Sequence, residues 1–138
     1  MSELYRMLAF RELGDERGNL IAIEGGQDIP FEIQRIFYMY GTDETMVRGQ
    51  HANRNSQFVL VNVSGASTIR VCDGLGQEAE VRLDQPRTAI YIPRMIWKEM
   101  KDFSRDSVIL CLTDTHYDPD EYIRDYEVYK QEMQKLVK

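Results

Sequence analysis

The sequence is poor in cysteine and histidine, and it contains no long run of basic or of apolar residues. Two cysteines in 138 residues, Cys72 and Cys111, are too few for a disulfide framework and predict a reducing, cytoplasmic setting. No apolar run reaches the roughly 18 residues of a membrane span, and the first residues lack the pattern of a signal peptide. The formal charge of −6, without a basic run longer than two residues, argues against nucleic acid as the main partner.

Short apolar segments separated by glycine and proline turns fill most of the chain. They are rich in β-branched and aromatic residues, which favour strands. Strands of this length at close spacing predict a mainly β sandwich or barrel, and 138 residues fit a single domain over 1–138. The predicted strands are Leu4–Phe10, Asn19–Glu24, Ile33–Tyr40, Gln57–Ser64, Ala66–Cys72, Gln77–Leu83, Thr88–Ile92, Ile96–Phe103 and Ser107–Leu112.

The C-terminal segment changes to a helical period. Asp118 is predicted as an N-cap, with Pro119 in the first helical position and Glu121 two residues later. We therefore expect one amphipathic helix that closes a face or edge of the barrel, and the alternative is a helix that binds a partner. Its apolar face is formed by residues three or four apart, namely Tyr122, Tyr126, Tyr129, Met133 and Leu136.

One stretch in the middle of the chain follows the outline of a metal-binding motif but has lost most of its ligands. It reads Gly49-x-His51-x-Asn53-x3-Gln57-x7-Gly65, which resembles the first cupin motif with shortened flanks. In a metal-binding cupin, two histidines two residues apart point to the same side of a strand and bind an ion with a later glutamate. Here Asn53 and Gln57 take the second histidine and glutamate positions. We expect neither a metal nor another cofactor.

Five elements in this order make nearly the whole chain resemble the cupin-type 3,4-ketoisomerases that act on dTDP-4-keto-6-deoxyglucose. The resemblance implies a cupin, or jelly-roll, β-barrel with a C-terminal helix, assembled as a homodimer in which N-terminal strands are exchanged. The elements are Asp15-x-Arg17-Gly18-x-Leu20, Arg35-x-x-Tyr38, Arg48-Gly49-x-His51-Ala52, Pro93-x-x-x-Trp97-x-x-Met100-x-Asp102-Phe103-Ser104 and Tyr117-Asp118-x-x-x-Tyr122-Ile123-Arg124-x-Tyr126.

The resemblance also implies a reaction and a place for it. The family moves a keto group from C4 to C3 of a sugar on a thymidine diphosphate handle. The product normally goes to a pyridoxal-phosphate aminotransferase that makes 3-amino-3,6-dideoxy sugars for surface glycans such as the O-antigen of lipopolysaccharide. This chain departs from the family pattern at three points: His51-Ala52-Asn53 replaces His-Ala-His, Trp97-Lys98 replaces Trp-His, and Gln57-Phe58 replaces Glu-Gln.

The reaction needs a base that removes the C3 proton, and a proton must then reach C4. An imidazole has an ordinary pKa near 6.5, so His51 is the expected base, against the alternative of a structural barrel histidine. Asn53 is expected to hydrogen-bond the sugar or the enediolate oxygen. Lys98 is expected to stabilise that oxygen or act as a second acid, and Tyr38 to hold a hydroxyl group or relay a proton; the plain alternatives are a surface lysine and a core tyrosine.

Guanidinium groups are the expected ligands of the diphosphate, because their planar geometry matches phosphate. The resemblance singles out Arg17, Arg35 and Arg48, although each alone could be a solvated or salt-bridged arginine. Trp97 is expected among the residues that contact the substrate. The second histidine, His116, is expected at the surface or near a cap rather than in the chemistry.

Two other classes of function stay open from the sequence. One is a nucleotide-sugar epimerase of the cupin superfamily, which would use the same acidity of a C–H bond next to a carbonyl group. The other is a catalytically weak cupin that only binds or senses a sugar, which the loss of the second motif histidine favours.

Overall fold

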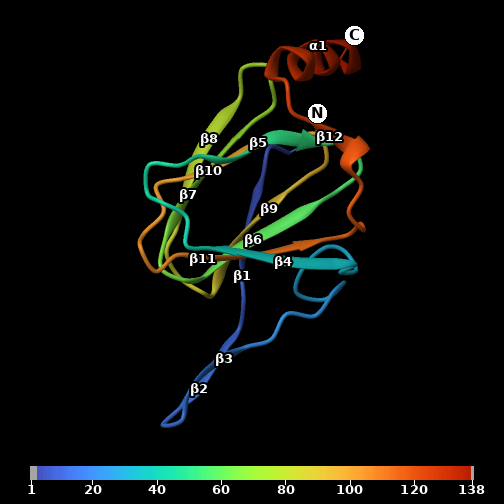
Figure 1. Ribbon diagram of the computed structural model, residues 1–138. Helices are drawn as coiled ribbons and strands as arrows, with labels where there is room; N and C mark the ends of the chain where they lie inside the picture. The colour runs from blue at the N-terminus through green and yellow to red at the C-terminus, as the bar shows by residue number, and fades with distance from the viewer. Residues whose placement is uncertain (1–2, 138) are drawn as a thin grey trace.

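Two five-stranded antiparallel sheets face each other and enclose the main hydrophobic core (Figure 1). The structure is a computed structural model that describes residues 3–137. We call the sheets the β4 sheet and the β5 sheet after the strands that matter for the site. The β4 sheet has the order β1 (Arg6–Ala9), β9 (Thr88–Ile92), β6 (Phe58–Ser64), β11 (Val108–Thr113) and β4 (Arg35–Tyr40). The β5 sheet has the order β12 (Tyr122–Ile123), β5 (Arg48–Asn53), β10 (Trp97–Lys101), β7 (Ser67–Cys72) and β8 (Glu78–Leu83).

Side chains that alternate along the strands fill the space between the two sheets. Phe58 and Ile109 come from the β4 sheet, and Ile69 and Met100 come from the β5 sheet, and all four belong to one buried cluster. Each such side chain contributes on the order of 1.5–3 kcal/mol to folding when it leaves water. The mainly β barrel that the strand pattern predicts is therefore confirmed.

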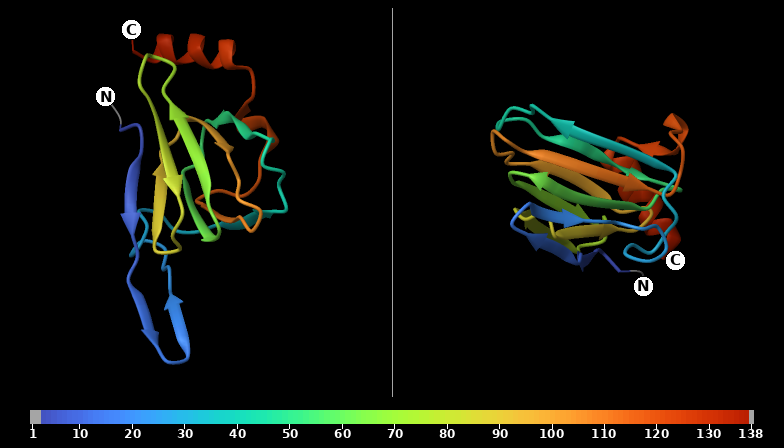
Figure 2. Two further views of the ribbon diagram at one scale, coloured as in Figure 1. Left: turned by 90° about the vertical axis from the view of Figure 1, so that its left-hand side faces the viewer. Right: turned by 90° about the horizontal axis from the view of Figure 1, so that it is seen from below.

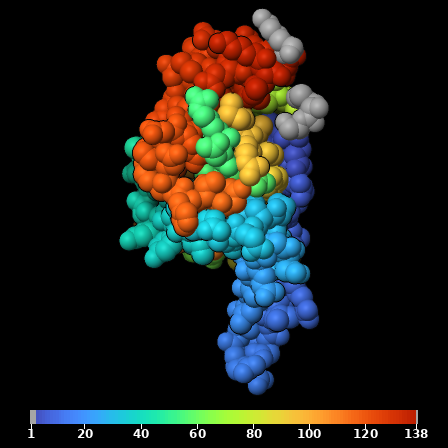
Figure 3. Space-filling view, turned by 90° about the vertical axis from the view of Figure 1, so that its right-hand side faces the viewer, coloured from blue at the N-terminus to red at the C-terminus, as the bar shows by residue number. Residues whose placement is uncertain are grey.

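A hairpin near the N-terminus stands free of this barrel. It consists of β2 (Glu12–Asp15) and β3 (Gly18–Ile21), which pair only with each other. Figures 2 and 3 show it as an extension that points away from the rest of the chain. The preceding strand β1 pairs with β9 of its own barrel, and Phe10 is buried. The segment that leaves the barrel is thus the hairpin, whereas β1 lies within the β4 sheet.

The C-terminal helix is correctly predicted in kind but begins later than expected. Asp118 caps only a 3-10 turn, Pro119–Glu121, by accepting a hydrogen bond from the backbone of Asp120. The next two residues form β12 and pair with the end of β5. This pairing gives the backbone groups at the edge of β5 hydrogen-bond partners, which a helix at these positions would not supply. The α-helix α1 then spans Tyr126–Leu136, with Asp125 as its N-cap.

The helix covers the outer side of the β5 sheet. Tyr129 and Met133 on its buried face pack against Ala52 of β5 and Trp97 of β10. The hydroxyl group of Tyr129 donates to the carbonyl oxygen of Met95 at 2.6 Å, which fastens the helix to the loop before β10. Within residues 3–137, the structure contains no helix of the length and apolar character that a membrane span requires.

Candidate active site

His51, Asn53 and Lys98 face the inside of the barrel from two neighbouring strands. Lys98 of β10 lies directly opposite His51 of β5 in the antiparallel register. The residue between the two motif positions, Ala52, points the other way and packs beneath the helix. The period of two along a strand therefore places His51 and Asn53 on one side, as the motif predicts.

A bulge in β5 fixes the orientation of the His51 ring. The register of β5 against β10 shifts between Lys98 and Glu99, which leaves Gln50 as an extra residue. Gly49 and Gln50 both adopt positive φ angles, of 83° and 59°. The carbonyl oxygen of Gly49 then lies 3.1 Å from Nδ1 of His51. Because a carbonyl group can only accept, Nδ1 carries the hydrogen and Nε2 presents a free lone pair.

Glycine is required at position 49 by its positive φ angle and also by the close approach of β10. A Cβ atom there would lie 2.9 Å from the carbonyl oxygen of Lys98, closer than side chains tolerate. A larger residue would therefore push β5 away from β10 and separate His51 from Lys98. Gly49 is therefore needed to place His51 opposite Lys98, and not to make the strand flexible.

Lys98 is buried, with only 3% of its surface exposed. Its Nζ atom donates to Oδ1 of Asn53 at 2.8 Å and lies 4.2 Å from the centre of the Phe58 ring. The amide nitrogen of Asn53 is buried and has no hydrogen-bond partner within the part of the chain described. The site thus holds one cation and one unused amide donor next to the imidazole.

Burial shifts the protonation of both ionisable groups. Burial, aided by the positive charges of Lys98 and Arg124, lowers the pKa of His51 to about 3, although the bond to Gly49 opposes this. Burial also lowers the pKa of Lys98 to about 7, and the carboxylate of Glu121 limits that fall. The imidazole is therefore neutral over the physiological range, which is the form that accepts a proton. An ordinary value near 6.5, as expected from the residue type, does not hold in the folded chain.

Phe58, rather than Gln57, shares the barrel interior with these residues. Gln57 points outward, where its amide donates to Asp114 at 2.8 Å and its carbonyl oxygen accepts from Tyr91. Phe58 instead contacts the Lys98 ammonium group. The interior position that a metal-binding cupin would give to a carboxylate is therefore aromatic here, and the assignment of this position to Gln57 is wrong.

The interior side chains do not fit the metal that the cupin motif usually binds. They offer one imidazole, one amide, one ammonium group and an aromatic ring, and an ammonium group repels a divalent ion. No group of three or more His, Cys, Asp or Glu residues in the described range 3–137 is arranged to hold an ion. We therefore assign no chemical step to a metal.

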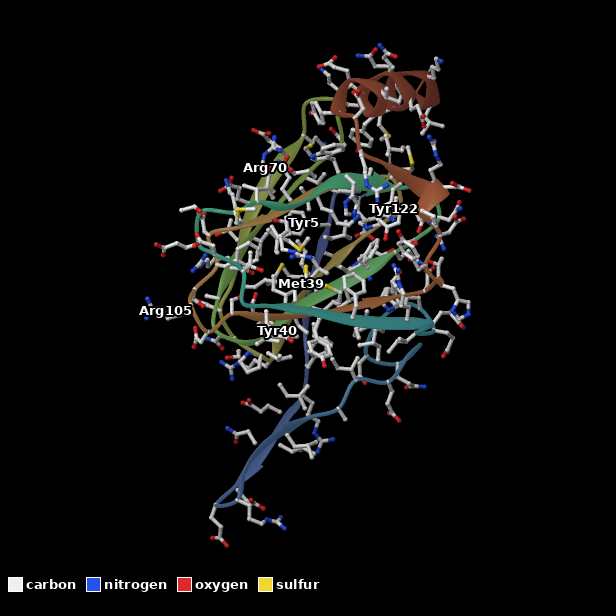
Figure 4. The ribbon with its side chains drawn as sticks, viewed as in Figure 1. Tyr5, Met39, Tyr40, Arg70, Arg105 and Tyr122 are labelled. Atoms are coloured by element: carbon white, nitrogen blue, oxygen red, sulfur yellow. The ribbon has the colours of Figure 1, made fainter. Side chains whose placement is uncertain are left out.

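Two arginine side chains lie near the interior, one on β4 and one on β5. Arg35 of β4 lies over the rings of Phe37 and Tyr117, at 5.1 and 5.4 Å from their centres. Nε of Arg48 is 3.0 Å from the sulfur of Met39, and the Met39 side chain points between the two sheets (Figure 4).

The charges of these groups reach the centre of the barrel. Burial raises the pKa of the Cys111 thiol to about 12, and Lys98, Arg48 and Arg35 oppose that rise. Arg124 acts in the same way on His51. Four basic residues of a chain with a formal charge of −6 thus act on the interior groups His51 and Cys111, two of them, Arg48 and Arg124, from exposed positions.

Three residues predicted for the site, Tyr38, Trp97 and Arg17, lie outside the barrel interior. Tyr38 is 62% exposed on the outer face of β4, because it alternates with Arg35 and Phe37. Its neighbour Tyr40, with which it stacks, lies on the opposite side of β4 from Met39 (Figure 4). Trp97 is buried on the outer side of β10 beneath the helix.

Arg17 lies in the turn of the free hairpin and is bonded to Asp15 at 2.6 Å. The hairpin itself points away from the barrel (Figure 1). The remaining histidine, His116, is exposed in the loop after β11, as expected.

Tyr122 is a residue of this site that the sequence interpretation missed. Its position in β12 is paired with Asn53, and its ring centre lies 4.8 Å from that of His51 in an edge-to-face arrangement (Figure 4). The helical spacing Tyr122, Tyr126, Tyr129 suggested a helix face instead. The signal that could have placed it is the separate N-cap Asp125.

The sequence matches a known protein family almost from end to end. Residues 3–134 match the family model described as FdtA: WxcM-like, C-terminal. The chain belongs to this family. It is 36% identical over 131 residues to a TDP-4-oxo-6-deoxy-alpha-D-glucose-3,4-oxoisomerase of Aneurinibacillus thermoaerophilus, covering 95% of this chain and 94% of the relative.

Solved structures of sugar 3,4-ketoisomerases have the same fold. The 3,4-ketoisomerase QdtA from Thermoanaerobacterium thermosaccharolyticum, a histidine-to-asparagine mutant in complex with TDP-4-keto-6-deoxyglucose, is 33% identical with a TM-score of 0.93. That comparison covers 98% of this chain and 97% of QdtA. The TDP-fucose-3,4-ketoisomerase WlaRA from Campylobacter jejuni is 36% identical with a TM-score of 0.90, covering 97% and 98%. The resemblance to cupin-type sugar 3,4-ketoisomerases is confirmed.

Proposed function

We propose that the protein is an isomerase that moves the keto group of TDP-4-keto-6-deoxyglucose from C4 to C3 through an enediol. The observation that carries the proposal is a neutral imidazole with a free Nε2 inside a cationic barrel, in a member of the FdtA-like family. The relatives compared above carry the names of TDP-sugar 3,4-oxo- or ketoisomerases.

His51 is the proposed base. Its Nε2 takes the proton from C3, and the electron pair of that C–H bond forms the C3=C4 double bond as negative charge develops on the C4 oxygen. The C4 oxygen then gains a proton in exchange for the proton that the C3 oxygen loses, which completes the enediol. The imidazolium ion then returns a proton to C4 while the C3 oxygen becomes the carbonyl oxygen. No electrons leave the sugar, so the reaction needs no redox partner.

Lys98 and Asn53 are proposed to stabilise the oxygen that gains negative charge. The ammonium group of Lys98 is held in place by Asn53, and the free amide hydrogen of Asn53 is a second donor. Fixed donors in a buried site stabilise charge better than water does, because they need not reorient.

Arg35 and Arg48 are proposed to hold the diphosphate. Both bring positive charge to the barrel interior, and the buried Nε of Arg35 has no partner among the residues described. Guanidinium groups bind phosphate oxygens in pairs, so the two arginines suit a diphosphate better than a neutral sugar.

Incubation of the purified protein with TDP-4-keto-6-deoxyglucose tests the proposal. Nuclear magnetic resonance should show a 3-keto product, in the gluco or the galacto configuration at C4. A 4-keto product with inverted configuration beside the ketone would identify an epimerase instead. Binding of the nucleotide without any change in the sugar would indicate a protein that only binds it.

Activity should not depend on a metal ion. The side chains that face the interior are poor ligands for a divalent ion, so treatment with EDTA followed by gel filtration should leave kcat unchanged. Loss of turnover that is restored by a stoichiometric metal ion would contradict this prediction.

We also propose a homodimer in which the β2–β3 hairpins are exchanged. An isolated two-stranded hairpin is marginally stable in water, and the cross-strand pair Leu13 and Leu20 is 49% and 59% exposed. The outer face of β4 offers a matching apolar surface, with Ile36, Tyr38 and Tyr40 all more than half exposed. A second copy of the chain would cover both surfaces at once, and Arg17 would reach substrate only across this interface.

Removal of the hairpin should abolish the dimer. Glu12 and Ile21 face each other at its base, so a Gly-Ser link between Arg11 and Ala22 would remove residues 12–21 without moving the barrel. We expect a change from dimer to monomer in light scattering, together with loss of solubility as the outer face of β4 becomes exposed.

The single change Arg17→Ala is the matched control. It should leave the dimer intact, because it removes no apolar surface, and should raise KM if Arg17 contacts the phosphates. A soluble, fully active monomer after removal of the hairpin would contradict the exchange.

A further inference from the structure

We propose that Tyr122 is a catalytic residue that carries the proton between the C3 and C4 oxygens of the sugar. The inference deepens the proposed ketoisomerase function and rests on it. His51 accounts for the proton that moves between the two carbons, but a second proton must leave the C3 oxygen and another must reach the C4 oxygen. That exchange needs a group that can both donate and accept, and a phenolic hydroxyl group does both.

Tyr122 lies where such a group is required. Its ring touches the His51 ring, with centres 4.8 Å apart and planes at 66°. Its hydroxyl oxygen faces Nη2 of Arg35, 3.5 Å away on the opposite sheet, so the phenol spans the interior from β12 to β4. The guanidinium group of Arg124 lies 4.5 Å from the centre of the Tyr122 ring. The sugar that His51 deprotonates would therefore lie beside the phenol.

The chain fixes Tyr122 through its neighbour Glu121. The Glu121 side chain is buried, and its carboxylate accepts from the backbone nitrogens of Asn55 and Ser56 at 2.8 and 3.0 Å and from the Ser56 hydroxyl group. Its carbonyl oxygen accepts from the backbone of Arg54 at 3.0 Å. A buried carboxylate with this many donors locks β12 onto the end of β5 and so holds the phenol against His51.

The other candidates for this role fit less well. Tyr38 points away from its own barrel. Lys98 lies directly opposite His51 with its ammonium group bonded to Asn53, and Asn53 cannot exchange protons near neutral pH. Tyr122 is the one tyrosine among residues 3–137 whose ring packs against His51.

The proton balance closes over one turnover. His51 first removes the C3 proton, which leaves an imidazolium ion and an enediolate whose charge lies on the C4 oxygen beside Lys98 and Asn53. The phenol then gives its proton to the C4 oxygen, which leaves an enediol and a phenolate. The phenolate then takes the proton from the C3 oxygen, and the imidazolium ion gives its proton to C4. The sugar ends with a C3 carbonyl group and a C4 hydroxyl group, and both side chains return to their starting state.

Tyr122→Phe separates this role from a structural one. The variant keeps the ring against His51 and removes only the hydroxyl group. In D2O we expect product formation to fall about 10²-fold while deuterium still enters C3 of the recovered substrate at close to the wild-type rate. This split arises because His51 still forms the enediolate, which then collapses back to substrate.

Tyr126→Phe is the matched control, because it removes a hydroxyl group on the outer side of the β5 sheet, next to Trp97. It should retain wild-type turnover. Product formation by Tyr122→Phe near the wild-type rate would overturn the inference, and so would an equal fall of product formation and C3 exchange. Wild-type protein that makes no 3-keto product would instead refute the proposed function itself.

Discussion

Replacement of His51 by asparagine should lower kcat by about 10²–10⁴-fold, the usual cost of losing a general base. The side chains are similar in size, and the arginines proposed to hold the diphosphate are untouched, so KM should change little. The measurement is steady-state turnover of TDP-4-keto-6-deoxyglucose by wild type and variant. The incorporation of deuterium at C4 of the product should fall together with turnover, since His51 carries this proton.

The second histidine provides the control. His116→Asn makes the same chemical change at an exposed position outside the barrel and should leave both kcat and KM unchanged. If His51→Asn kept wild-type kcat while remaining folded, His51 would not be the base, and Lys98 would become the leading candidate.

The low pKa of His51 affects its strength as a base. In the free protein, burial and the charges of Lys98 and Arg124 keep the imidazole neutral down to a pKa of about 3. A bound diphosphate brings negative charge next to the arginines, which we expect to raise the pKa of His51 and make it a stronger base when substrate is present. Substrate binding and base strength would then be linked through the same cations.

Sequence patterns were sufficient to predict the barrel and the position of its central residues. The alternation along the motif placed His51 and Asn53 on one side of a strand, and the strand ends at glycine and proline were nearly right. Lys98 was singled out because it occupies a position where the family has another histidine, and it is buried rather than at the surface. Local chemistry decides these features, so local sequence reveals them.

Features that depend on contacts between residues far apart in the sequence could not be predicted from the sequence. Trp97 and Lys98 are consecutive in a strand, so only one of them can face the barrel, but which one depends on how the helix packs on Trp97. Tyr122 fitted a helical period, and only its pairing with β5 shows that it joins the site. The pKa of His51 follows from burial and from Lys98 and Arg124, which lie far from it in sequence.

Replacement of Lys98 by methionine should lower kcat by about 10²–10³-fold, the effect of removing one strong donor to a developing oxyanion. Methionine matches the length of the apolar part of lysine and can keep the contact with Phe58. The matched control is Lys101→Met on the same strand, where the lysine pairs with Glu80 at the surface. Retention of wild-type kcat by Lys98→Met would show that the ammonium group takes no part in the chemistry.

The pH dependence gives an independent test of the same lysine. The ammonium group of Lys98 is lost as the pH rises through about 7, so kcat/KM of the wild type should fall about tenfold per pH unit above that value, and this fall should be absent from Lys98→Met. Stability should change in the opposite direction. Between pH 7 and the ordinary lysine pKa of 10.5, the unfolded chain binds more protons than the folded one, so the free energy of unfolding rises with pH.

The variant should lose this rise in stability as well as the fall in activity. Thermal unfolding of both proteins at pH 6, 8 and 10 measures the first, and kcat/KM over the same range measures the second. At pH 6 the variant should be the more stable protein, because it no longer buries an ammonium group, and the difference should shrink toward pH 10. An activity profile that falls above pH 7 in both proteins would assign the titration to a group other than Lys98.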